Sequence, residues 1–369
     1  MQTVLNGLKF YNMKIGVDLR PLLHGDLSGV PTYTKCLVKE MIRHKEHEFV
    51  LFLSGWDEKY KKILDQFQGE NVRKVFWRIP NRVFNVFPRL DFDVDVFLFP
   101  DMRPAILPKK VKKVVICHDL SFIKFPGFFS FKSRLWYFFN NPRKYFRGAD
   151  RVISVSKFTQ KELANILGVR SEVVYEGAYV PKCKDFACVK RKYGLPDKYI
   201  LSLSALEPRK NLKKVIEAYL MADLDCEFVL AGSFDEKIFA KYSLPKNTKI
   251  RFVGPVAHED KEALYKLSSG LVYVSLYEGF GLPVLEAMSC GVNVLTSKGS
   301  SMEEIGDDAI LYADPLSVDD IVSGMRKLVA GEPDKGKLAA RAKEFSWEKA
   351  AGEVVKQSSI CLSRRYSQI

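Results

Sequence analysis

A loop with two glycines lies between two glutamates in the segment Glu278–Glu286, EGFGLPVLE. The segment follows the apolar run 271–274, which reads as a strand, and it leads into a helical pattern. Gly279 and Gly281 let the backbone approach a ligand closely, and free N–H groups at the start of the helix favour an anion or hydroxyl groups. A carboxylate accepts hydrogen bonds from two hydroxyl groups, so this spacing suits a sugar at one glutamate and a ribose at the other.

Two cations follow another predicted strand, at the point where a helix begins. Arg209 and Lys210 come after the apolar run Tyr199–Leu203, where they and the amides of a helix N-terminus would neutralise a pyrophosphate. Both segments also have structural interpretations, because a Gly-Phe-Gly turn can simply join a strand to a helix and two cations can form a solvated helix start. The order and spacing of these motifs along the chain favour the functional interpretation.

Two loops in the first half of the chain are further candidates. His118 follows the strand-like run Val114–Cys117, and a histidine there can hydrogen-bond a donor or an acceptor, although a lone histidine is more often structural. Asp119 is expected to orient this loop or to meet an acceptor hydroxyl. Gly29 precedes a helical pattern at Thr32–Arg43, where either a diphosphate approaches the backbone or the chain makes an ordinary turn.

The elements that must position these loops are short apolar runs that alternate with helical patterns, which predicts parallel sheets covered by helices. In the first half the predicted strands are Lys14–Leu19, Glu48–Leu53, Val96–Phe99, Val114–Cys117 and Arg151–Val155. In the second half they are Tyr199–Leu203, Phe228–Ala231, Lys249–Val253, Leu271–Val274 and Val292–Leu295. Helices are predicted at 212–221, 260–267, 283–289, 318–328, 335–343 and 347–358. The candidate loops follow the carboxyl ends of strands, where ligands of open α/β sheets bind.

The length of 369 residues suits two domains. We assign residues 13–180 and 181–345 to these domains, with the aperiodic stretch Tyr179–Ala187 as the linker, and 346–369 to a final segment. Met13 opens the first predicted strand and is a candidate natural start.

Taken together, these motifs resemble those of the retaining family 4 glycosyltransferases, also called group 1, which have the GT-B fold. The resembling segments are 278–286 (the Glu-x7-Glu motif), 204–212 (a phosphate-binding turn), 118–122 (an acceptor-side histidine loop), 28–30 (an N-terminal glycine loop), 149–156 and 345–347. The resemblance extends from Met13 to about Gln357. It implies an α/β protein with two Rossmann-like domains that face a central cleft, an acceptor-binding N-terminal domain, a nucleotide-sugar-binding C-terminal domain, and a C-terminal helix that packs back on the N-terminal domain.

The resemblance also implies a role for each candidate residue. The donor-binding set is Gly29, Ser204, Arg209, Lys210, Gly279, Phe280, Gly281, Leu282 and Glu286; the acceptor-side pair is His118 and Asp119; and the catalytic set is His118, Glu278, Lys210 and Arg209. Glu278 would hold the donor sugar and Glu286 the ribose. Ser204 stands where many relatives have a phosphate-binding arginine, so either Arg209 or Lys210 is the main phosphate ligand.

An alternating acidic motif, Asp91-x-Asp93-x-Asp95, is like the carboxylate pair that holds a divalent metal in the other glycosyltransferase architecture. The alternation puts all three side chains on one face of an extended segment that runs into Val96–Phe99, and we interpret them as a solvated start of this strand. The resemblance to the family 4 glycosyltransferases implies that the donor is bound without a metal. We therefore expect no metal and no cofactor, the nucleotide sugar being a substrate.

A formal net charge of +14 attracts anions, which include nucleic acid, an acidic membrane surface and phosphorylated small molecules. No nucleic-acid-binding signature is present, so we expect no nucleic acid partner. The segment Phe122–Arg147 interleaves aromatic and basic residues, which is typical either of peripheral contact with an anionic membrane or of a buried helix. The chain has seven cysteines without a C-x-x-C pair and no apolar run long enough to span a bilayer. We therefore predict a cytoplasmic protein with reduced cysteines. It would lie at the inner face of the membrane if the segment Phe122–Arg147 binds lipid.

We predict a retaining hexosyltransferase of cell-surface polysaccharide or glycolipid synthesis, with a saccharide or lipid-linked acceptor. GDP-mannose is the favoured donor and a UDP-sugar the alternative, because the LEPRKN form of the phosphate-binding turn resembles bacterial mannosyltransferases. Two other functions stay open. One is a nucleotide-sugar 2-epimerase, which needs more sugar-facing carboxylates and histidines than a chain with five histidines readily offers. The other is a non-enzymatic basic protein that binds membrane surfaces.

Overall fold

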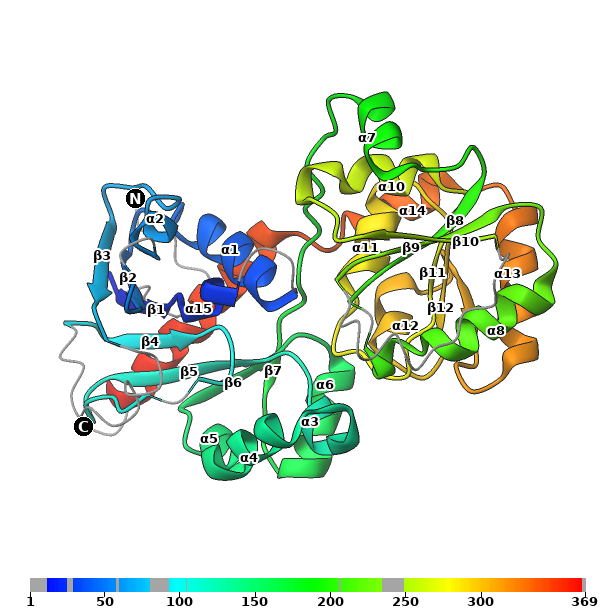
Figure 1. Cartoon of the computed structure of the whole chain (residues 1–369). Coiled ribbons are helices and arrows are strands. Elements are labelled where there is room, and N and C mark those ends of the chain that lie inside the picture. Colours follow the sequence, from blue (N-terminus) through cyan, green and yellow to red (C-terminus); the bar gives the residue numbers. More distant parts are fainter. Residues whose placement is uncertain are drawn as a thin grey trace.

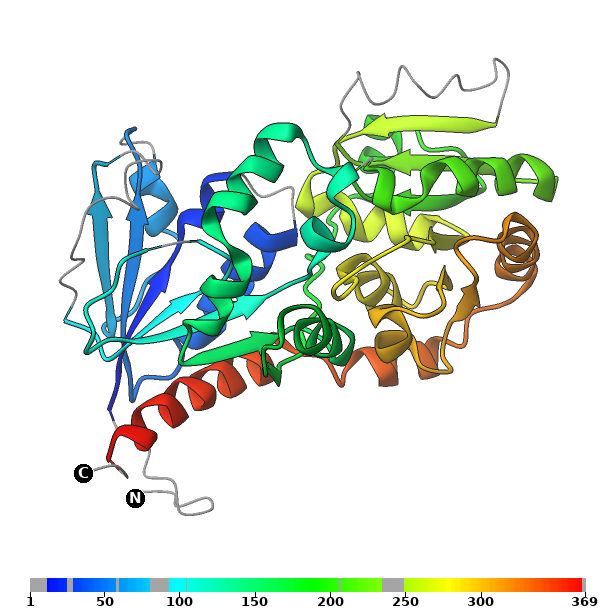
Figure 2. The same ribbon diagram turned by 90° about the horizontal axis from the view of Figure 1, so that it is seen from below.

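Two parallel β-sheets form the cores of two lobes in the computed structural model (Figure 1). The structure describes residues 12–24, 29–57, 60–79, 93–103, 105–205, 207–233 and 249–366. Within them, helices cover both faces of each sheet, and the lobes lie side by side (Figure 2). The predicted fold class, α/β with two Rossmann-like domains, is confirmed.

The N-terminal sheet has the strand order β3-β2-β1-β4-β5-β6-β7, and all its strands are parallel. Its strands are β1 (Lys14–Asp18), β2 (Glu48–Ser54), β3 (Val72–Trp77), β4 (Val96–Phe99), β5 (Lys112–Cys117), β6 (Arg151–Ser154) and β7 (Glu172–Val173). Its helical segments are η1 (Arg20–His24), α1 (Gly29–Met41), α2 (Lys61–Leu64), α3 (Ser121–Lys124), η3 (Pro126–Phe128), α4 (Phe131–Asn140), α5 (Pro142–Arg147), α6 (Lys157–Glu162) and η4 (Leu163–Leu167).

Successive residues of β5 show how this sheet is buried on both faces. Val114 and Ile116 pack in the core that also contains α1, whereas Val115 and Cys117 pack on the opposite face with side chains of α5. Side chains alternate between the faces of a strand, so a strand covered on both sides is a continuous apolar run. This is why the central strands could be predicted from the sequence.

The C-terminal sheet has the order β10-β9-β8-β11-β12-β13, again all parallel. Its strands are β8 (Tyr199–Leu203), β9 (Glu227–Ala231), β10 (Ile250–Gly254), β11 (Gly270–Tyr273), β12 (Val294–Ser297) and β13 (Leu311–Ala313). Its helical segments are α7 (Phe186–Tyr193), η5 (Pro208–Lys210), α8 (Leu212–Ala222), η6 (His258–Asp260), α10 (Lys261–Leu267), α11 (Leu282–Ser289), α12 (Ser301–Gly306), α13 (Val318–Ala330) and α14 (Lys335–Ala342).

The last helix, α15 (Trp347–Tyr366), returns from the C-terminal lobe to the N-terminal one. It packs against α1 and contacts β4, β5 and β6 (Figures 1 and 2). We predicted its end at Ser358, but Ser358 and Cys361 are buried against the N-terminal lobe. The sequence after Ser358 is too polar to continue the apolar pattern, and packing against the N-terminal lobe extends the helix there. No helix among the described residues has the length and apolar character needed to cross a bilayer.

Three edge strands, β3, β7 and β13, were not predicted, because they are short or too polar to show a period of two. Helix α7 begins inside the stretch predicted as linker, where the Asp185 side chain accepts a hydrogen bond from the Cys188 amide at 2.8 Å. An aspartate at this position is a helix N-cap. Helix α1 begins at Gly29, three residues before the predicted start, with Pro31 in its first turn, where proline is tolerated.

Candidate active site

The strongest candidate residues meet at the point where the order of strands reverses in the C-terminal sheet. Arg209 and Lys210 lie in η5, which follows β8, and Glu278 lies in the loop that follows β11. Strands β8 and β11 are neighbours in this sheet. Their connections leave in opposite directions, and this arrangement opens a crevice at the carboxyl ends of the strands.

Glu278 forms ion pairs with both cations. Its Oε2 atom lies 3.0 Å from Nη1 of Arg209, and its Oε1 atom lies 2.6 Å from Nζ of Lys210. Lys210 also donates a hydrogen bond to the hydroxyl of Tyr273, and Nε of Arg209 donates one to Glu207 at 2.7 Å. We call Arg209, Lys210, Glu278 and Tyr273 the cationic cluster.

The charges of the cationic cluster determine its protonation. Burial disfavours the Glu278 carboxylate, but Arg209 and Lys210 outweigh burial and lower the pKa of Glu278 to about 2. Burial lowers the pKa of Lys210, although Glu278 opposes this shift. Glu278 is therefore an anion at neutral pH. A diphosphate that binds Arg209 or Lys210 must replace the contact of that cation with the Glu278 carboxylate.

The glycine loop is held from two sides. The hydroxyl of Ser301 donates hydrogen bonds to the carbonyl oxygens of Glu278 and Phe280, at 2.9 and 2.8 Å. Gly281 has a φ of 119° immediately before α11, a conformation that favours glycine. A Cβ atom on Gly279 would lie 1.7 Å from the carbonyl oxygen of His118 in the other lobe, so only glycine fits there.

Contacts between the lobes converge on this glycine. The hydroxyls of Ser156 and Thr159, in the N-terminal lobe, donate hydrogen bonds to the carbonyl oxygen of Gly279 at 2.6 and 3.1 Å. The Leu120 amide donates one to the hydroxyl of Tyr277 at 3.2 Å. The loop that carries Glu278 is thereby fixed against the loop that carries His118.

Glu286 is bonded separately, on α11. Its carboxylate accepts hydrogen bonds from Nζ of Lys261 at 2.8 and 3.0 Å and from the hydroxyl of Tyr265 at 2.8 Å. Ser204 follows β8, and Gly29 starts α1. Over the described ranges, no hydrogen bond or ion pair joins Glu286, Ser204 or Gly29 to the cationic cluster. The donor-binding roles predicted for these three residues stay predictions.

His118 is bonded through both ring nitrogens. Nε2 lies 2.7 Å from the carbonyl oxygen of Pro100, and Nδ1 lies 3.3 Å from Oε1 of the buried Glu176. Burial opposes a charge on the ring, but Glu176 prevails and raises the pKa of His118, while burial raises the pKa of Glu176. A hydrogen bond from His118 to a substrate must replace one of these two bonds, and the role assigned to this histidine stays a prediction.

Asp119 shapes the turn that leads into α3. Its Oδ1 atom accepts hydrogen bonds from the amide and the hydroxyl of Ser121, at 2.9 and 2.6 Å. An aspartate that caps a turn in this way fixes the backbone around it. This geometry suits a residue that orients the histidine loop.

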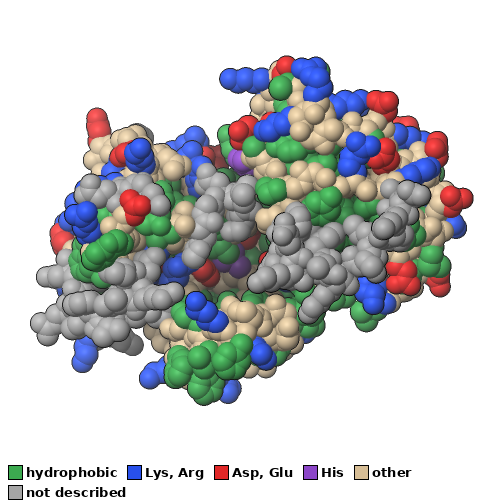
Figure 3. Space-filling view, viewed as in Figure 1, with side chains coloured by type: hydrophobic (Ala, Val, Ile, Leu, Met, Phe, Trp, Pro, Cys, Tyr) green, Lys and Arg blue, Asp and Glu red, His purple; other side chains and the backbone are tan. Residues whose placement is uncertain are grey.

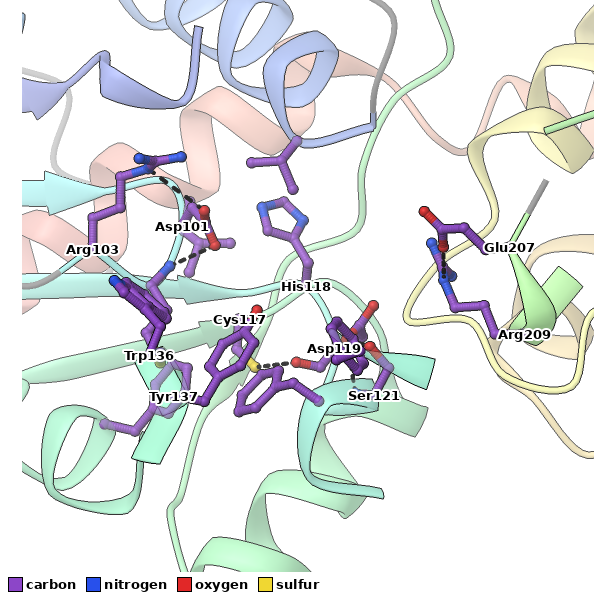
Figure 4. Close-up of a pocket in the computed structure, with 16 residues that line it drawn as sticks. Asp101, Arg103, Cys117, His118, Asp119, Ser121, Trp136, Tyr137, Glu207 and Arg209 are labelled. Carbon is purple, nitrogen blue, oxygen red and sulfur yellow. Dashed lines mark hydrogen bonds and ion pairs between the residues drawn. The ribbon is translucent and has the colours of Figure 1, made fainter. Parts of the chain in front are cut away.

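A cavity of about 520 Å³ lies between the lobes (Figure 4). Its lining residues are Val30, Asp101, Met102, Arg103, Ile116, Cys117, His118, Asp119, Ser121, Phe122, Phe129, Trp136, Tyr137, Phe146, Glu207 and Arg209. The space-filling view shows the molecule hollowed between the lobes (Figure 3). The cavity reaches from the cationic cluster, through Arg209, to the predicted acceptor-side pair.

The aromatic and basic segment is exposed at α4. None of the described side chains of α4 is buried, and Phe131, Phe138 and Phe139 are 72%, 77% and 73% exposed. Hydrophobic side chains gather at this edge of the N-terminal lobe (Figure 3). The interpretation as a buried helix is therefore wrong for α4, although Tyr145 and Phe146 of α5 are buried.

Part of the acidic motif is described at the start of β4. Asp93 forms an ion pair with the side chain of Lys14, and Asp95 accepts a hydrogen bond from the Lys14 amide at 2.9 Å. Asp91 lies outside the described residues, as do Ser28 of the glycine loop and Leu206 of the phosphate-binding turn.

Several residues of the site were missed from the sequence. Tyr273 ends a buried strand, Ser301 lies on a helix that was not predicted, and Glu176 appeared only as part of the segment before the linker. Tyr273 ends the predicted strand that precedes Glu278, so its position at the carboxyl end of a strand is the signal that could have found it. Glu176 follows β7, which was not predicted, so the sequence offered no such signal for this residue.

Two family models match the chain, one in each lobe. Residues 27–178 match the model described as Glycosyltransferase Family 4, and residues 189–345 match the model described as Glycosyl transferases group 1.

Curated relatives include two enzymes of Escherichia coli. O-antigen chain mannosyltransferase B is 30% identical over 271 residues, which are 68% of this chain and 71% of that protein. Serotype-specific mannosyltransferase WbdA is 33% identical over 270 residues, 65% of this chain but only 32% of that protein. The matched segment is thus about a third of the length of WbdA.

Solved structures of similar fold include WaaG, a glycosyltransferase involved in lipopolysaccharide biosynthesis, with a TM-score of 0.66 and 13% identity over 93% of this chain and 99% of that one. The Anabaena protein Alr3699/HepE, in complex with UDP and glucose, has a TM-score of 0.61 and 18% identity over 96% of this chain and 98% of that one. At this level of identity the likeness establishes the shared fold.

Proposed function

The chain belongs to the family 4, or group 1, glycosyltransferases, and on this premise we propose that it transfers a hexosyl unit from a nucleotide sugar with retention at the anomeric carbon. The bond between the anomeric carbon and the diphosphate oxygen breaks, and a bond to the acceptor oxygen forms. The departing phosphate accepts the proton of the acceptor hydroxyl. The reaction uses no metal ion and no cofactor.

The observation that carries this proposal is the cationic cluster at the strand-order reversal. Charge develops on the departing nucleoside diphosphate, and Arg209 and Lys210 would stabilise it. Their ion pairs with Glu278 hold the two cations close together, which supports this role. These two cations and the amides at the start of α11 would replace a divalent metal as the counter-charge. Glu278 and the Gly279–Leu282 backbone would hold the sugar, and Glu286 the ribose.

The donor we propose is GDP-mannose. The names of the relatives from Escherichia coli, O-antigen chain mannosyltransferase B and serotype-specific mannosyltransferase WbdA, support mannose as the sugar. The solved HepE complex holds UDP and glucose, so a UDP-sugar is the alternative.

The acceptor we propose is a saccharide or lipid-linked saccharide of cell-surface polysaccharide synthesis, as the name of the O-antigen relative suggests. The reaction would take place in the cytoplasm at the inner face of the membrane. Exposed Phe131, Phe138 and Phe139 on α4, with Lys132 and Arg134 between them, suit peripheral contact with anionic lipid. Binding to phosphatidylglycerol vesicles should weaken when Phe138 and Phe139 are both changed to serine.

A thermal-shift panel of GDP-, UDP- and ADP-sugars tests the donor, and product analysis tests the reaction. We expect GDP-mannose to raise the melting temperature most, and an α-linked product to form in the presence of EDTA. Three results would contradict the proposal: no shift with any nucleotide sugar, activity that returns only with added Mg²⁺, or an epimerised donor formed without an acceptor.

A further inference from the structure

The wall of the cavity farthest from the cationic cluster comes from the N-terminal lobe. Asp101 and Arg103 follow β4, and Trp136 reaches the cavity from α4 (Figure 4). The three residues come from two segments of the chain, and the parallel sheet brings the end of β4 next to the end of β5, where His118 and Asp119 lie.

The polar groups of this wall are only partly satisfied. Nε of Arg103 is buried without a hydrogen-bond partner among the described residues, and its ion-pair distance to Oδ2 of Asp101 is 3.6 Å. Oδ1 of Asp101 accepts a hydrogen bond from the Met102 amide at 2.6 Å. The two side chains line the cavity and are 20% and 33% exposed, so the guanidinium and the carboxylate keep hydrogen-bonding groups that a ligand can reach. Buried polar groups generally have partners, and the loose pairing of these two therefore points to a ligand that completes it.

The aromatic part of the wall is partly exposed. Trp136 lines the cavity and is 41% exposed, whereas the neighbouring Tyr137 is stacked on Phe122 with ring centroids 4.2 Å apart. Trp136 contacts the edge of this pair, with its ring centroid 5.1 Å from that of Tyr137, and it still keeps surface available. An aromatic ring beside a few convergent polar groups is the usual composition of a small-molecule site.

The charge of the cavity differs from that of the whole chain. Its charged lining residues, apart from His118, are Asp101, Asp119, Glu207, Arg103 and Arg209. Three carboxylates therefore face two guanidinium groups, in a chain whose net charge is +14. Arg103 is paired with Asp101, and Arg209 is paired with Glu207 and Glu278. Such a surface favours hydroxyl groups, which both donate and accept hydrogen bonds, over an anion.

We propose that Asp101, Arg103 and Trp136 bind the neutral terminal sugar of a saccharide acceptor. The sugar ring packs on Trp136, its hydroxyls donate hydrogen bonds to Asp101, and Arg103 donates to a ring or hydroxyl oxygen. The reactive hydroxyl then points along the cavity towards Asp119 and Arg209. This proposal rests on the proposed function and narrows its acceptor: the unit that receives the hexose carries no phosphate.

Steady-state kinetics with two matched acceptors tests the proposal: a neutral mannose disaccharide, and the same disaccharide phosphorylated on its terminal sugar. We expect measurable transfer to the neutral acceptor and at least tenfold lower kcat/KM for the phosphorylated one. Trp136→Ala and Asp101→Asn should each raise the KM for the neutral acceptor about tenfold. The KM for the donor and its slow hydrolysis without acceptor should not change, and Trp136→Phe should recover most of the loss.

Leu135→Ala is the matched control, because Leu135 lies on the same helix next to Trp136, is 43% exposed and does not line the cavity. It should leave the acceptor KM unchanged. An unchanged acceptor KM in both Trp136→Ala and Asp101→Asn, or a preference for the phosphorylated disaccharide, overturns the acceptor proposal while donor hydrolysis still supports the transferase. Absence of donor binding and of hydrolysis in the unmodified protein overturns the proposed function itself, and the acceptor proposal with it.

Discussion

The two walls of the cavity between the lobes satisfy their charges in different ways. On the C-terminal side, the lining residue Arg209 is paired with Glu207 and with Glu278 behind it, and Glu278 also pairs with Lys210, so these charges are paired without a ligand. On the N-terminal side, Arg103 keeps an unbonded buried Nε, and its carboxylate partner is 3.6 Å away. The C-terminal wall is therefore held in place before a ligand binds, whereas the N-terminal wall gains its missing hydrogen bonds from the substrate.

Loss of either cation of the C-terminal wall should have the largest effect on activity. Arg209→Ala and Lys210→Ala should each lower kcat/KM about 100-fold, the size of effect found when one group that stabilises developing charge is lost. The larger loss identifies the main phosphate ligand. The measurement is initial rates with GDP-mannose, and Lys213→Ala on the exposed side of α8 is the control. Retention of a tenth or more of the activity in both variants would show that the cluster is structural.

How far the sequence predicts this site depends on where its parts come from. Arg209, Lys210 and Glu278 lie in two short motifs, each directly after an apolar strand, so type and spacing were enough to identify them. Their ion pairing was not predicted, because it depends on the adjacency of β8 and β11.

The acceptor wall was harder to predict. Asp101 and Arg103 lie in a segment without a motif, and Trp136 lies in the aromatic and basic segment that was interpreted as a membrane contact or a buried helix. Only the order of strands and the position of α4 bring the three residues together. The edge strands β3, β7 and β13 were not predicted for a related reason: their pairing depends on the neighbouring strands and not on an apolar pattern of their own.

Glu286 tests whether the donor wall extends along α11. Glu286→Gln should raise the KM for the donor about tenfold, since a carboxamide accepts fewer hydrogen bonds from the ribose hydroxyls while it keeps the shape of the side chain. Equilibrium binding of GDP provides the measurement. Glu262→Gln, whose carboxylate pairs with Lys266 at 2.7 Å, is a control on the neighbouring helix. Unchanged GDP binding in Glu286→Gln would refute the ribose assignment.

The two walls face each other only while the lobes stay together, and Glu304 of α12 contributes to this contact. Its carboxylate accepts hydrogen bonds from the amides of Lys157 and Phe158, at 2.8 and 2.5 Å, and from the hydroxyl of Tyr175 at 3.2 Å. It thus caps α6 of the opposite lobe, and loss of such a cap costs about 1 kcal/mol.

Glu304→Ala should therefore lower the transfer rate about fivefold, an effect corresponding to this cap energy. GDP binding should persist, because the cationic cluster lies within one lobe. Small-angle scattering should show a larger radius of gyration for the variant. The adjacent, exposed Glu303 offers the control Glu303→Ala. Equal scattering and equal rates for the two variants would mean that other contacts hold the lobes together.

The smallest expected effect concerns Lys113, a cation of the N-terminal lobe that is held mainly by an aromatic ring. Its Nζ atom lies 3.5 Å from the centroid of the Tyr145 ring, and burial lowers its pKa to about 8, while Asp150 opposes this shift. In the unfolded chain the pKa of lysine is about 10.4, so the unfolded state binds this proton more tightly. The Lys113 contribution therefore destabilises the fold below pH 8, and this cost disappears as the pH rises from about 8 to about 10.

Lys113→Met should consequently raise the thermal unfolding midpoint at pH 7 by about 2 °C, equivalent to about 1 kcal/mol, and the gain should shrink at pH 9 to 10. Lys112→Met is the control, because Lys112 pairs with Asp150 at 2.8 Å nearer the surface, and pairs of that kind contribute less than about 1 kcal/mol. Nζ of Lys113 also donates a hydrogen bond to the carbonyl oxygen of Tyr145 at 3.4 Å. If Lys113→Met instead lowers the midpoint equally at every pH, the ring and the carbonyl of Tyr145 stabilise the charge as fully as Glu278 does in the cationic cluster. Incomplete pairing of charges in the N-terminal lobe would then be confined to Arg103 in the cavity wall.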